Sequence, residues 1–293
     1  MIKKILIIGS SSMLGKRLHL DLVKANYTVL TCGKKDDSDI YLDLESEILP
    51  NLPSNLIIDC IFHCASSFEN DSIEGFKKNE KINSYSSILI SEIAKQLNCK
   101  VLIYAGSIFS SDRNEDLKML NSYALSKYRS EQIFQNILYK NKIKFMSLRL
   151  SQLIDDTGEC VKHQPWFGRI IYSAISGVSI SIPQCNFKQN FIHIEDASQA
   201  LIAGMESKKE GIHPFTHYED ISYYDLALLS YKLLKSKGSI NIDYDKAPFR
   251  EYYFPSSKKT YEIIDFIPKI KIEKIIERIK NEKSALMFNP EIK

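Results

Sequence analysis

The chain has 293 residues, of which 44% are hydrophobic and 26% are charged, and its formal net charge at pH 7 is +3. A chain of this length buries a large core, and this composition is that of an ordinary globular protein. The small charge and the lack of a dense basic tract argue against a nucleic-acid partner. The apolar runs are too short to span a bilayer, so we expect no membrane association.

The six cysteines form no C-x-x-C pair and do not cluster with histidines at the spacing of a metal site; they are residues 32, 60, 64, 99, 160 and 185. We therefore expect no metal site. We also expect the thiols to be reduced, as they are in the cytoplasm. The apolar run in the N-terminal "MIKKILIIGSSS" is shorter than the core of a signal peptide, so a buried strand is the better interpretation.

The first half of the chain alternates strand-like and helix-like segments. Strands are expected at 3–9, 27–33, 56–65, 99–107 and 144–151, and helices at 13–26, 83–98 and 122–140. Strands separated by helices predict βαβ units, hence a parallel sheet with right-handed crossovers. The predicted fold class is α/β, a Rossmann-type doubly wound parallel sheet with a smaller C-terminal substrate-binding part.

The second half is less regular. Residues 154–168 form a loop-rich excursion, 189–205 return to a strand and a helix, and a late helix is expected near 270–283. We expect a dinucleotide-binding domain at 1–155, completed by about 187–210. The smaller substrate-binding domain then comprises 156–186 and 211–293.

The loop "IIGSSSMLG" follows the first strand and opens the first helix. Gly9 supplies the tight turn and Gly15 the close packing of helix on strand that a dinucleotide pyrophosphate needs, and Ser11, Met13 and Leu14 line the same loop. Ser12 stands where a second glycine is expected. The alternative is an ordinary strand–loop–helix turn, but the strand before and the helix after it are the context that the motif requires.

The second strand carries no acid at its end to bind a ribose 2′-hydroxyl. Lys34 and Lys35 follow it, and two cations there suit a 2′-phosphate. This favours NADP, with NAD as the alternative because Asp36 and Asp37 lie close by. A solvated charged loop would explain the same residues.

The stretch "NSYALSKYRSEQIF" places Tyr123 and Lys127 one helical turn apart. Neighbours at i and i+4 on a helix often form no more than a surface pair. Alternatively, the ammonium of Lys127 lowers the pKa of the Tyr123 phenol and makes it a proton shuttle.

Further segments follow in order along the chain: "YLDL", "IFHCASS", "KINSYSS", "LIYAGS", "LRLSQLIDDTG" and "QNFIHIEDASQAL". Together with the glycine loop and the Tyr-x-x-x-Lys, they resemble the extended short-chain dehydrogenase/reductases of the NAD-dependent epimerase/dehydratase family, which mostly act on nucleotide sugars. The resemblance covers roughly residues 2–204. It departs from the family pattern at Ser12, at the lost Tyr-Gly-Pro after "LRLSQL", and at Gln189, where arginine is common.

The resemblance implies roles for individual residues. Ser107, Tyr123 and Lys127 take the catalytic positions, and Ser107 would also contact the substrate. The implied cofactor-binding residues are those of the glycine loop together with Lys34, Asp43, Leu44, Cys64, Ala65, Ser66, Asn83, Tyr123 and Lys127.

The residues after Ser107 reduce the number of family reactions that we expect for this chain. The family's dehydratases carry Asp-Glu there, and its 3,5-epimerising members a cysteine two residues on, whereas this chain has Ile108 and Phe109. We therefore expect NADPH-dependent reduction of a 4-keto-6-deoxy nucleotide sugar, with a nucleotide-sugar 4-epimerase as the alternative. A catalytically silent NADP-binding sensor is a third possibility.

The substrate side of the site is harder to assign. A nucleotide diphosphate needs cations and an aromatic slot, for which we select Lys162, Trp166, Arg169 and Arg250. Trp166 could equally belong to the core, and Arg169 to a solvated helix face. The resemblance also implies a homodimer formed through the helix that carries Tyr123 and the helix before it.

Overall fold

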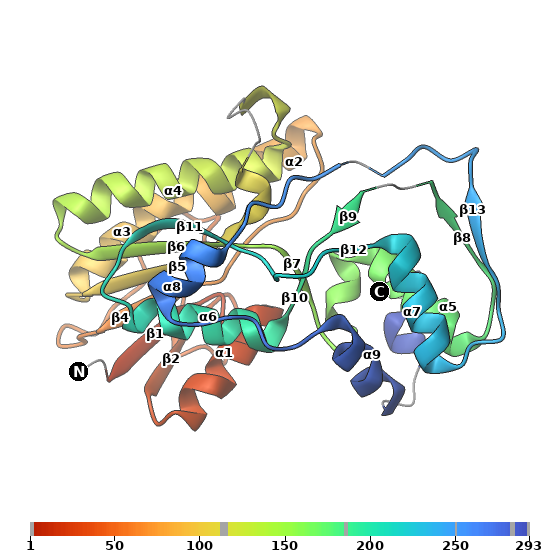
Figure 1. Ribbon diagram of the computed structural model, residues 1–293. Helices are drawn as coiled ribbons and strands as arrows, with labels where there is room; N and C mark the ends of the chain where they lie inside the picture. Colours follow the sequence, from red (N-terminus) through yellow and green to blue (C-terminus); the bar gives the residue numbers. More distant parts are fainter. Residues whose placement is uncertain (1–2, 112–116, 185–186, 250, 282–284, 292–293) are drawn as a thin grey trace. The chain divides into compact units, whose positions relative to one another are not determined.

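The computed structural model describes residues 3–111, 117–184, 187–249, 251–281 and 285–291. Its chain divides into two compact units, each built from separate stretches of sequence (Figure 1). Unit 1 is Met1–Leu150, Ser198–Phe215 and Ser256–Ile267, and unit 2 is Ser151–Ala197, Thr216–Pro255 and Pro268–Lys293.

Unit 1 is organised around a seven-stranded sheet with the order β11-β6-β5-β4-β1-β2-β3, in which every neighbouring pair is parallel. Its strands are β1 (Lys4–Ile8), β2 (Thr28–Gly33), β3 (Ile40–Tyr41), β4 (Cys60–His63), β5 (Val101–Ser107), β6 (Lys144–Leu150) and β11 (Gly211–Phe215). The central strands are continuous apolar runs because helices cover both of their faces. This confirms the predicted Rossmann-type parallel fold.

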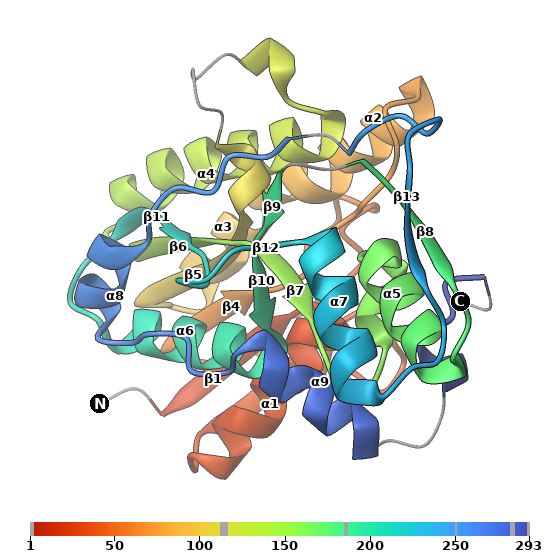
Figure 2. The same cartoon turned by 45° about the vertical axis from the view of Figure 1, so that its right-hand side comes forward.

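The helices of the sheet are α1 (Met13–Lys24), α2 (Ile73–Asn79), α3 (Ser86–Gln96), α4 (Ser122–Lys140), α6 (Ile194–Glu206) and α8 (Lys258–Ile264). Figures 1 and 2 show α3 and α4 on one face of the sheet and α1 and α6 on the other. A π-helical segment (Glu80–Tyr85) joins α2 to α3, and short 3-10 turns lie at Ile108–Ser110 and Leu117–Met119.

Capping side chains fix where the two helices of the candidate site begin. Ser12 caps α1 by accepting a hydrogen bond from the backbone N–H of Gly15 at 3.0 Å. Asn121 caps α4 in the same way, accepting from the N–H of Ala124 at 2.8 Å. Both caps lie where strands of the parallel sheet end, the edge at which such folds bind ligands.

Unit 2 contains three two-stranded ladders and three α-helices among its described residues. The strands are β7 (Gln152–Ile154) with β10 (Phe191–His193), β8 (Ile180–Pro183) with β13 (Ile240–Asp243), and β9 (Lys188–Gln189) with β12 (Ile221–Ser222). The helices are α5 (Pro165–Ser176), α7 (Tyr223–Leu234) and α9 (Ile272–Asn281), with 3-10 turns at Glu159–Lys162 and Ala285–Phe288.

The bounds of the two compact units differ from the domain boundaries expected from the sequence. Residues 187–197 belong to unit 2, whereas 211–215 and 256–267, which the sequence assigns to the smaller domain, belong to unit 1. The reason lies in β11, which pairs with β6 and completes the edge of the sheet.

Candidate functional site

The loop after β1 has the tight geometry that the glycine motif requires. Gly9 adopts φ +83°, and a Cβ built on it would lie 2.4 Å from the backbone nitrogen of Ala65 at the end of β4. A Cβ on Gly15 would lie 2.2 Å from the carbonyl oxygen of Gly9. Only glycine fits at either position, so the first helix packs directly against the loop. This is the cradle that a dinucleotide pyrophosphate needs, and the residues present fit that group.

The remaining loop residues occupy the start of α1. Ser11 is exposed, whereas Met13 is partly exposed and Leu14 is buried in the first turn of the helix. The hydroxyl of Ser12, the N-cap residue, accepts the hydrogen bond from the backbone N–H of Gly15. The serine in place of a second glycine therefore supplies the cap that orders the first turn of the helix.

Lys34, the cation expected to bind a 2′-phosphate, is engaged by two carboxylates. Its Nζ lies 2.9 Å from Asp43 and 2.9 Å from Glu45, and these contacts raise its pKa. Asp43 also accepts a hydrogen bond from the backbone of Glu45 at 2.8 Å, while Leu44 between them is buried in the core. Lys35 is exposed. A 2′-phosphate at this place must compete with the carboxylates for Lys34.

The end of β4 leads into a loop that Asn83 holds from the π-helical segment. The Oδ1 atom of Asn83 accepts hydrogen bonds from the backbone of Ser67 at 2.7 Å and from the hydroxyl of Ser66 at 3.1 Å. Its Nδ2 atom donates to the carbonyl of Ser67 at 2.9 Å and to Ser126 of α4 at 3.0 Å. The amide of Asn83 is thus committed to the chain itself, and it orders the loop that contains Cys64, Ala65 and Ser66.

Ser107 and Tyr123 meet where β5 ends and α4 begins. Ser107 is the last residue of β5 and is buried, and its hydroxyl accepts a hydrogen bond from the backbone N–H of Phe109 at 3.3 Å. The phenol of Tyr123 lies close enough to the hydroxyls of Ser107 and Ser66 for both to lower its pKa. The ring of Phe68 stacks on the Tyr123 ring, with centroids 4.6 Å apart. Ser66, expected on the cofactor side, also lies beside the phenol. Phe68 was not expected from the sequence, because loop geometry brings it to Tyr123.

Lys127 lies one turn further along α4 and is only 2% exposed. Its Nζ donates to the carbonyl oxygen of Ala105 at 2.8 Å and lies 4.0 Å from the ring centroid of Tyr104. Burial lowers the pKa of Lys127 to about 7, although the carboxylate of Glu131 opposes that effect. The amine therefore changes its charge near neutral pH.

The expectation that Lys127 lowers the pKa of Tyr123 is wrong for this structure. Burial raises the pKa of Tyr123 to about 12, and the nearby hydroxyls of Ser107 and Ser66 oppose the rise only in part. Lys127 instead contacts a carbonyl and a ring on the sheet side of the helix. The phenol is consequently neutral, and a potential proton donor, at ordinary pH.

The expected substrate-binding residues lie in unit 2. Trp166 is partly buried in α5, 4.9 Å from Phe249 and 6.3 Å from Tyr223 between ring centroids. Arg169 is exposed one turn later and holds its guanidinium 5.3 Å from the Trp166 ring. Lys162 is exposed in the preceding 3-10 turn. Arg250 lies outside the described residues.

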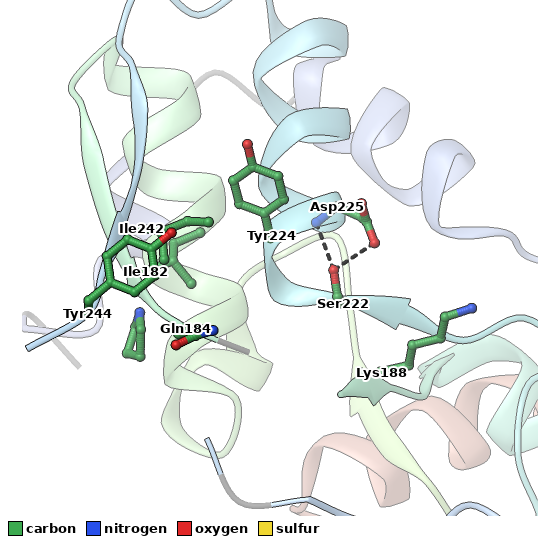
Figure 3. A pocket seen from close by; sticks show the side chains of 9 residues that line it. Ile182, Gln184, Lys188, Ser222, Tyr224, Asp225, Ile242 and Tyr244 are labelled. Carbon is green, nitrogen blue, oxygen red and sulfur yellow. Dashed lines mark hydrogen bonds between the residues drawn. The ribbon is translucent and has the colours of Figure 1, made fainter. Parts of the chain in front are cut away.

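A separate cavity of about 480 Å³ opens within unit 2 (Figure 3). Ile182 and Ile242 come from the β8–β13 ladder, Tyr244 follows β13 directly, and Tyr224 comes from α7. Its lining residues are Ile182, Pro183, Gln184, Lys188, Ser222, Tyr224, Asp225, Ile242 and Tyr244. This cavity depends on the pairing of β8 with β13, strands that are nearly sixty residues apart, and therefore could not be predicted from the sequence. No local pattern signals such a pairing.

Neither a metal site nor a membrane span is found in the part of the chain that the structure describes. No group of three or more histidine, cysteine or acidic side chains there could hold a metal ion. No described helix is both long and apolar enough to cross a membrane.

The family model "NAD dependent epimerase/dehydratase family" matches residues 5–218, which include the glycine loop, Ser107, Tyr123 and Lys127. The chain belongs to this family. This match confirms the family resemblance that the sequence motifs indicated, and it covers most of the chain. Among curated proteins, no sequence matches it.

Solved structures share the fold over nearly the whole chain. UDP-N-acetylglucosamine 4-epimerase from Bacillus cereus has a TM-score of 0.75 at 17% identity, covering 96% of both chains. UDP-glucose 4-epimerase from Thermotoga maritima, solved with UDP-glucose, has a TM-score of 0.74 at 14% identity, covering 95% of this chain and 97% of its own. RMD from Pseudomonas aeruginosa, complexed with NADPH, has a TM-score of 0.76 at 15% identity, covering 96% and 100%. At these identities the likeness concerns the fold.

Proposed function

We propose that this family member is an enzyme that reduces a 4-keto-6-deoxy nucleotide sugar with NADPH. The observation that carries the proposal is the placement of the Tyr123 phenol beside the hydroxyls of Ser107, at the end of β5, and Ser66, with the ring of Phe68 stacked on it. Reduction of a ketone needs a proton for the oxygen as well as a hydride for the carbon. A phenol whose pKa is raised to about 12 arrives protonated at neutral pH, as a proton donor must.

NADPH, when bound, supplies the hydride to the carbonyl carbon. Tyr123 transfers its phenolic proton to the carbonyl oxygen, which becomes the hydroxyl of the product. Ser107 donates a hydrogen bond to the same oxygen as negative charge develops on it. The tyrosine is left as a phenolate, which the hydroxyls of Ser107 and Ser66 stabilise until the proton is replaced from solvent.

The residues proposed to hold the cofactor lie along the strand ends of unit 1. The turn at Gly9 and the start of α1 take the pyrophosphate, Asp43 and Leu44 the adenine side, and the loop Cys64–Ser66 the nicotinamide side. Asn83 acts on that loop indirectly, since its amide is hydrogen-bonded to Ser66 and Ser67.

The preference for NADPH rests on the two lysines after β2. Lys34 and Lys35 are both exposed, and β2 ends without an acid. The carboxylates now paired with Lys34 are themselves at least a quarter exposed on their side chains, so exchanging them for a phosphate costs little desolvation. The RMD structure, complexed with NADPH, is a precedent on the same fold.

Unit 2 offers features suited to a nucleotide. We propose that Arg169 and Lys162 attract the diphosphate and that Trp166 provides an aromatic surface for the base. We further propose that the protein acts in the cytoplasm, where the buried thiols of Cys32, Cys60, Cys64, Cys99 and Cys160 remain reduced. A homodimer through α3 and α4 completes the proposal.

The discriminating experiment offers the purified protein two panels. One contains 4-keto-6-deoxy sugar nucleotides with NADPH, and the other contains UDP-glucose, UDP-N-acetylglucosamine and their 4-epimers with NAD. Net oxidation of NADPH in the first panel supports the reductase. Interconversion of epimers without net oxidation identifies a 4-epimerase instead, and tight NADPH binding with no turnover in either panel identifies a silent binding protein.

A further inference from the structure

A buried ion pair joins α4 to the sheet directly behind the candidate active site. Glu131 is 0% exposed, and its Oε2 lies 2.6 Å from Nη2 of Arg149 on β6. The Nε atom of Arg149 donates to both carboxylate oxygens at 3.1 and 3.0 Å, and the hydroxyl of Ser147 donates to Oε1 at 2.7 Å. The carboxylate therefore has four hydrogen bonds and a single fixed orientation.

This pair and its neighbour Ser147 contact the chain on both sides of Ser107, at Gly106 in β5 and at Ser111 after the following 3-10 turn. A Cβ on Gly106 would lie 2.9 Å from the carboxylate of Glu131 and 2.4 Å from the hydroxyl of Ser147, so the backbone just before Ser107 rests against them. Beyond Ser107, the Nη1 atom of Arg149 donates to the hydroxyl of Ser111 at 2.8 Å. Ser107 is thus held between two contacts of one ion pair.

The same pair holds the helix that carries the other two candidate residues. Tyr123, Lys127 and Glu131 follow one another at intervals of four on α4, and therefore share one face of the helix. Glu131 lies one turn beyond Lys127 and two turns beyond Tyr123. A rigid link from Glu131 to β6 and to the end of β5 fixes how far Ser107 stands from Tyr123.

We propose that Glu131 and Arg149 are positioning residues, which set the geometry of Ser107 relative to Tyr123 for proton transfer. The inference rests on the proposed reduction for its kinetic readout. Glu131 and Arg149 differ from the residues proposed to transfer the proton, because neither of them reaches the reacting atoms. The competing explanation is that the pair serves only to hold the fold together.

A double variant separates the two explanations. Breaking one partner of a buried ion pair leaves an uncompensated charge and destabilises the fold, whereas replacing both partners with well-packed hydrophobic side chains of similar volume is often neutral for stability. The variant Glu131→Met with Arg149→Met should melt within a few degrees of the wild type. Because a misplacement of about 1 Å can cost about a hundredfold in rate, we expect kcat to fall at least about tenfold. KM for the sugar nucleotide and Kd for NADPH should stay within about twofold, since the groups that bind them are untouched.

Two single variants complete the design. Ser111→Ala removes only the contact beyond Ser107 and should lower kcat without changing the melting temperature. The matched control is Lys100→Met, which breaks the ion pair between Lys100 and Asp59 (2.7 Å) at the opposite end of β5. It should leave kcat unchanged even where it lowers stability.

Wild-type kcat in both the double variant and Ser111→Ala would overturn the proposal. Hydrogen–deuterium exchange over residues 101–111 provides a readout without substrate: exchange at 107–111 should be faster in the double variant and unchanged in Lys100→Met. If the wild type reduces no sugar nucleotide, the proposed function fails, while the exchange measurement still decides the positioning role. Equal exchange in the wild type and the double variant would then refute it.

Discussion

Replacing Lys127 with methionine tests the buried amine at the centre of the site. In the unfolded chain its pKa is about 10.4, whereas burial lowers the pKa to about 7 in the folded protein. Between those values the unfolded chain binds a proton that the folded chain does not, so the free energy of unfolding rises with pH. Each pH unit contributes about 1.36 kcal/mol, and from about pH 7 to about pH 8.5 Lys127 therefore adds about 2 kcal/mol.

Urea unfolding at the two ends of this window measures the effect in the wild type and in Lys127→Met. The upper end coincides with the unfolded thiol pKa of about 8.5, where the raised pKa values of the buried cysteines begin to lower stability. That loss is common to the wild type and Lys127→Met, so it cancels in the comparison between them. The free energy of unfolding of the wild type should rise by about 2 kcal/mol more than that of the variant. The exposed Lys95→Met serves as the control and should follow the wild type. Equal pH dependence in the wild type and Lys127→Met would refute the account of a buried, proton-losing amine.

Three further variants probe the cofactor and substrate sides. Gly9→Ala places a Cβ at φ +83° against the end of β4, so NADPH affinity measured by fluorescence titration should fall at least about tenfold, whereas Gly33→Ala, whose Cβ would meet nothing closer than 3.8 Å, should bind normally. Lys34→Ala should weaken NADPH binding by about tenfold and leave NADH binding unchanged, because only the former carries a 2′-phosphate; equal losses for both cofactors would contradict that role. Phe68→Ala opens one face of the Tyr123 phenol to water and should lower its pKa from about 12, as followed by tyrosinate absorbance against a background variant Tyr123→Phe; an unchanged titration would show that the stacked ring contributes nothing to burial.

Much of the first unit could be predicted from local patterns. The periodicity of apolar residues predicts a helix over 122–140, and α4 spans Ser122–Lys140. The continuous apolar runs predict the buried strands β1, β4, β5 and β6, because parallel strands covered on both faces need no polar alternation. Strand β11 escapes prediction: it is a short edge strand containing Pro214, and only its pairing with β6 makes it a strand.

The chemistry of the site is less accessible from sequence than its residues. The spacing of Tyr123 and Lys127 is a local property of a helix, whereas the pKa of each depends on burial by distant segments. The contact of Glu131 with Arg149 likewise joins residues 18 positions apart on different elements. For that reason the sequence suggests the candidate pair Tyr123 and Lys127 but predicts the wrong direction for the pKa of Tyr123.

The most direct test of the central claim follows NADPH fluorescence during turnover of a 4-keto-6-deoxy sugar nucleotide, in the wild type beside Tyr123→Phe. The phenylalanine ring keeps the stacking with Phe68 and removes only the proton donor. The account predicts one NADPH consumed per ketone in the wild type, and a rate lower by at least about a hundredfold in the variant with unchanged cofactor affinity. Consumption at the wild-type rate in Tyr123→Phe, or none in a wild type that binds NADPH, would contradict it.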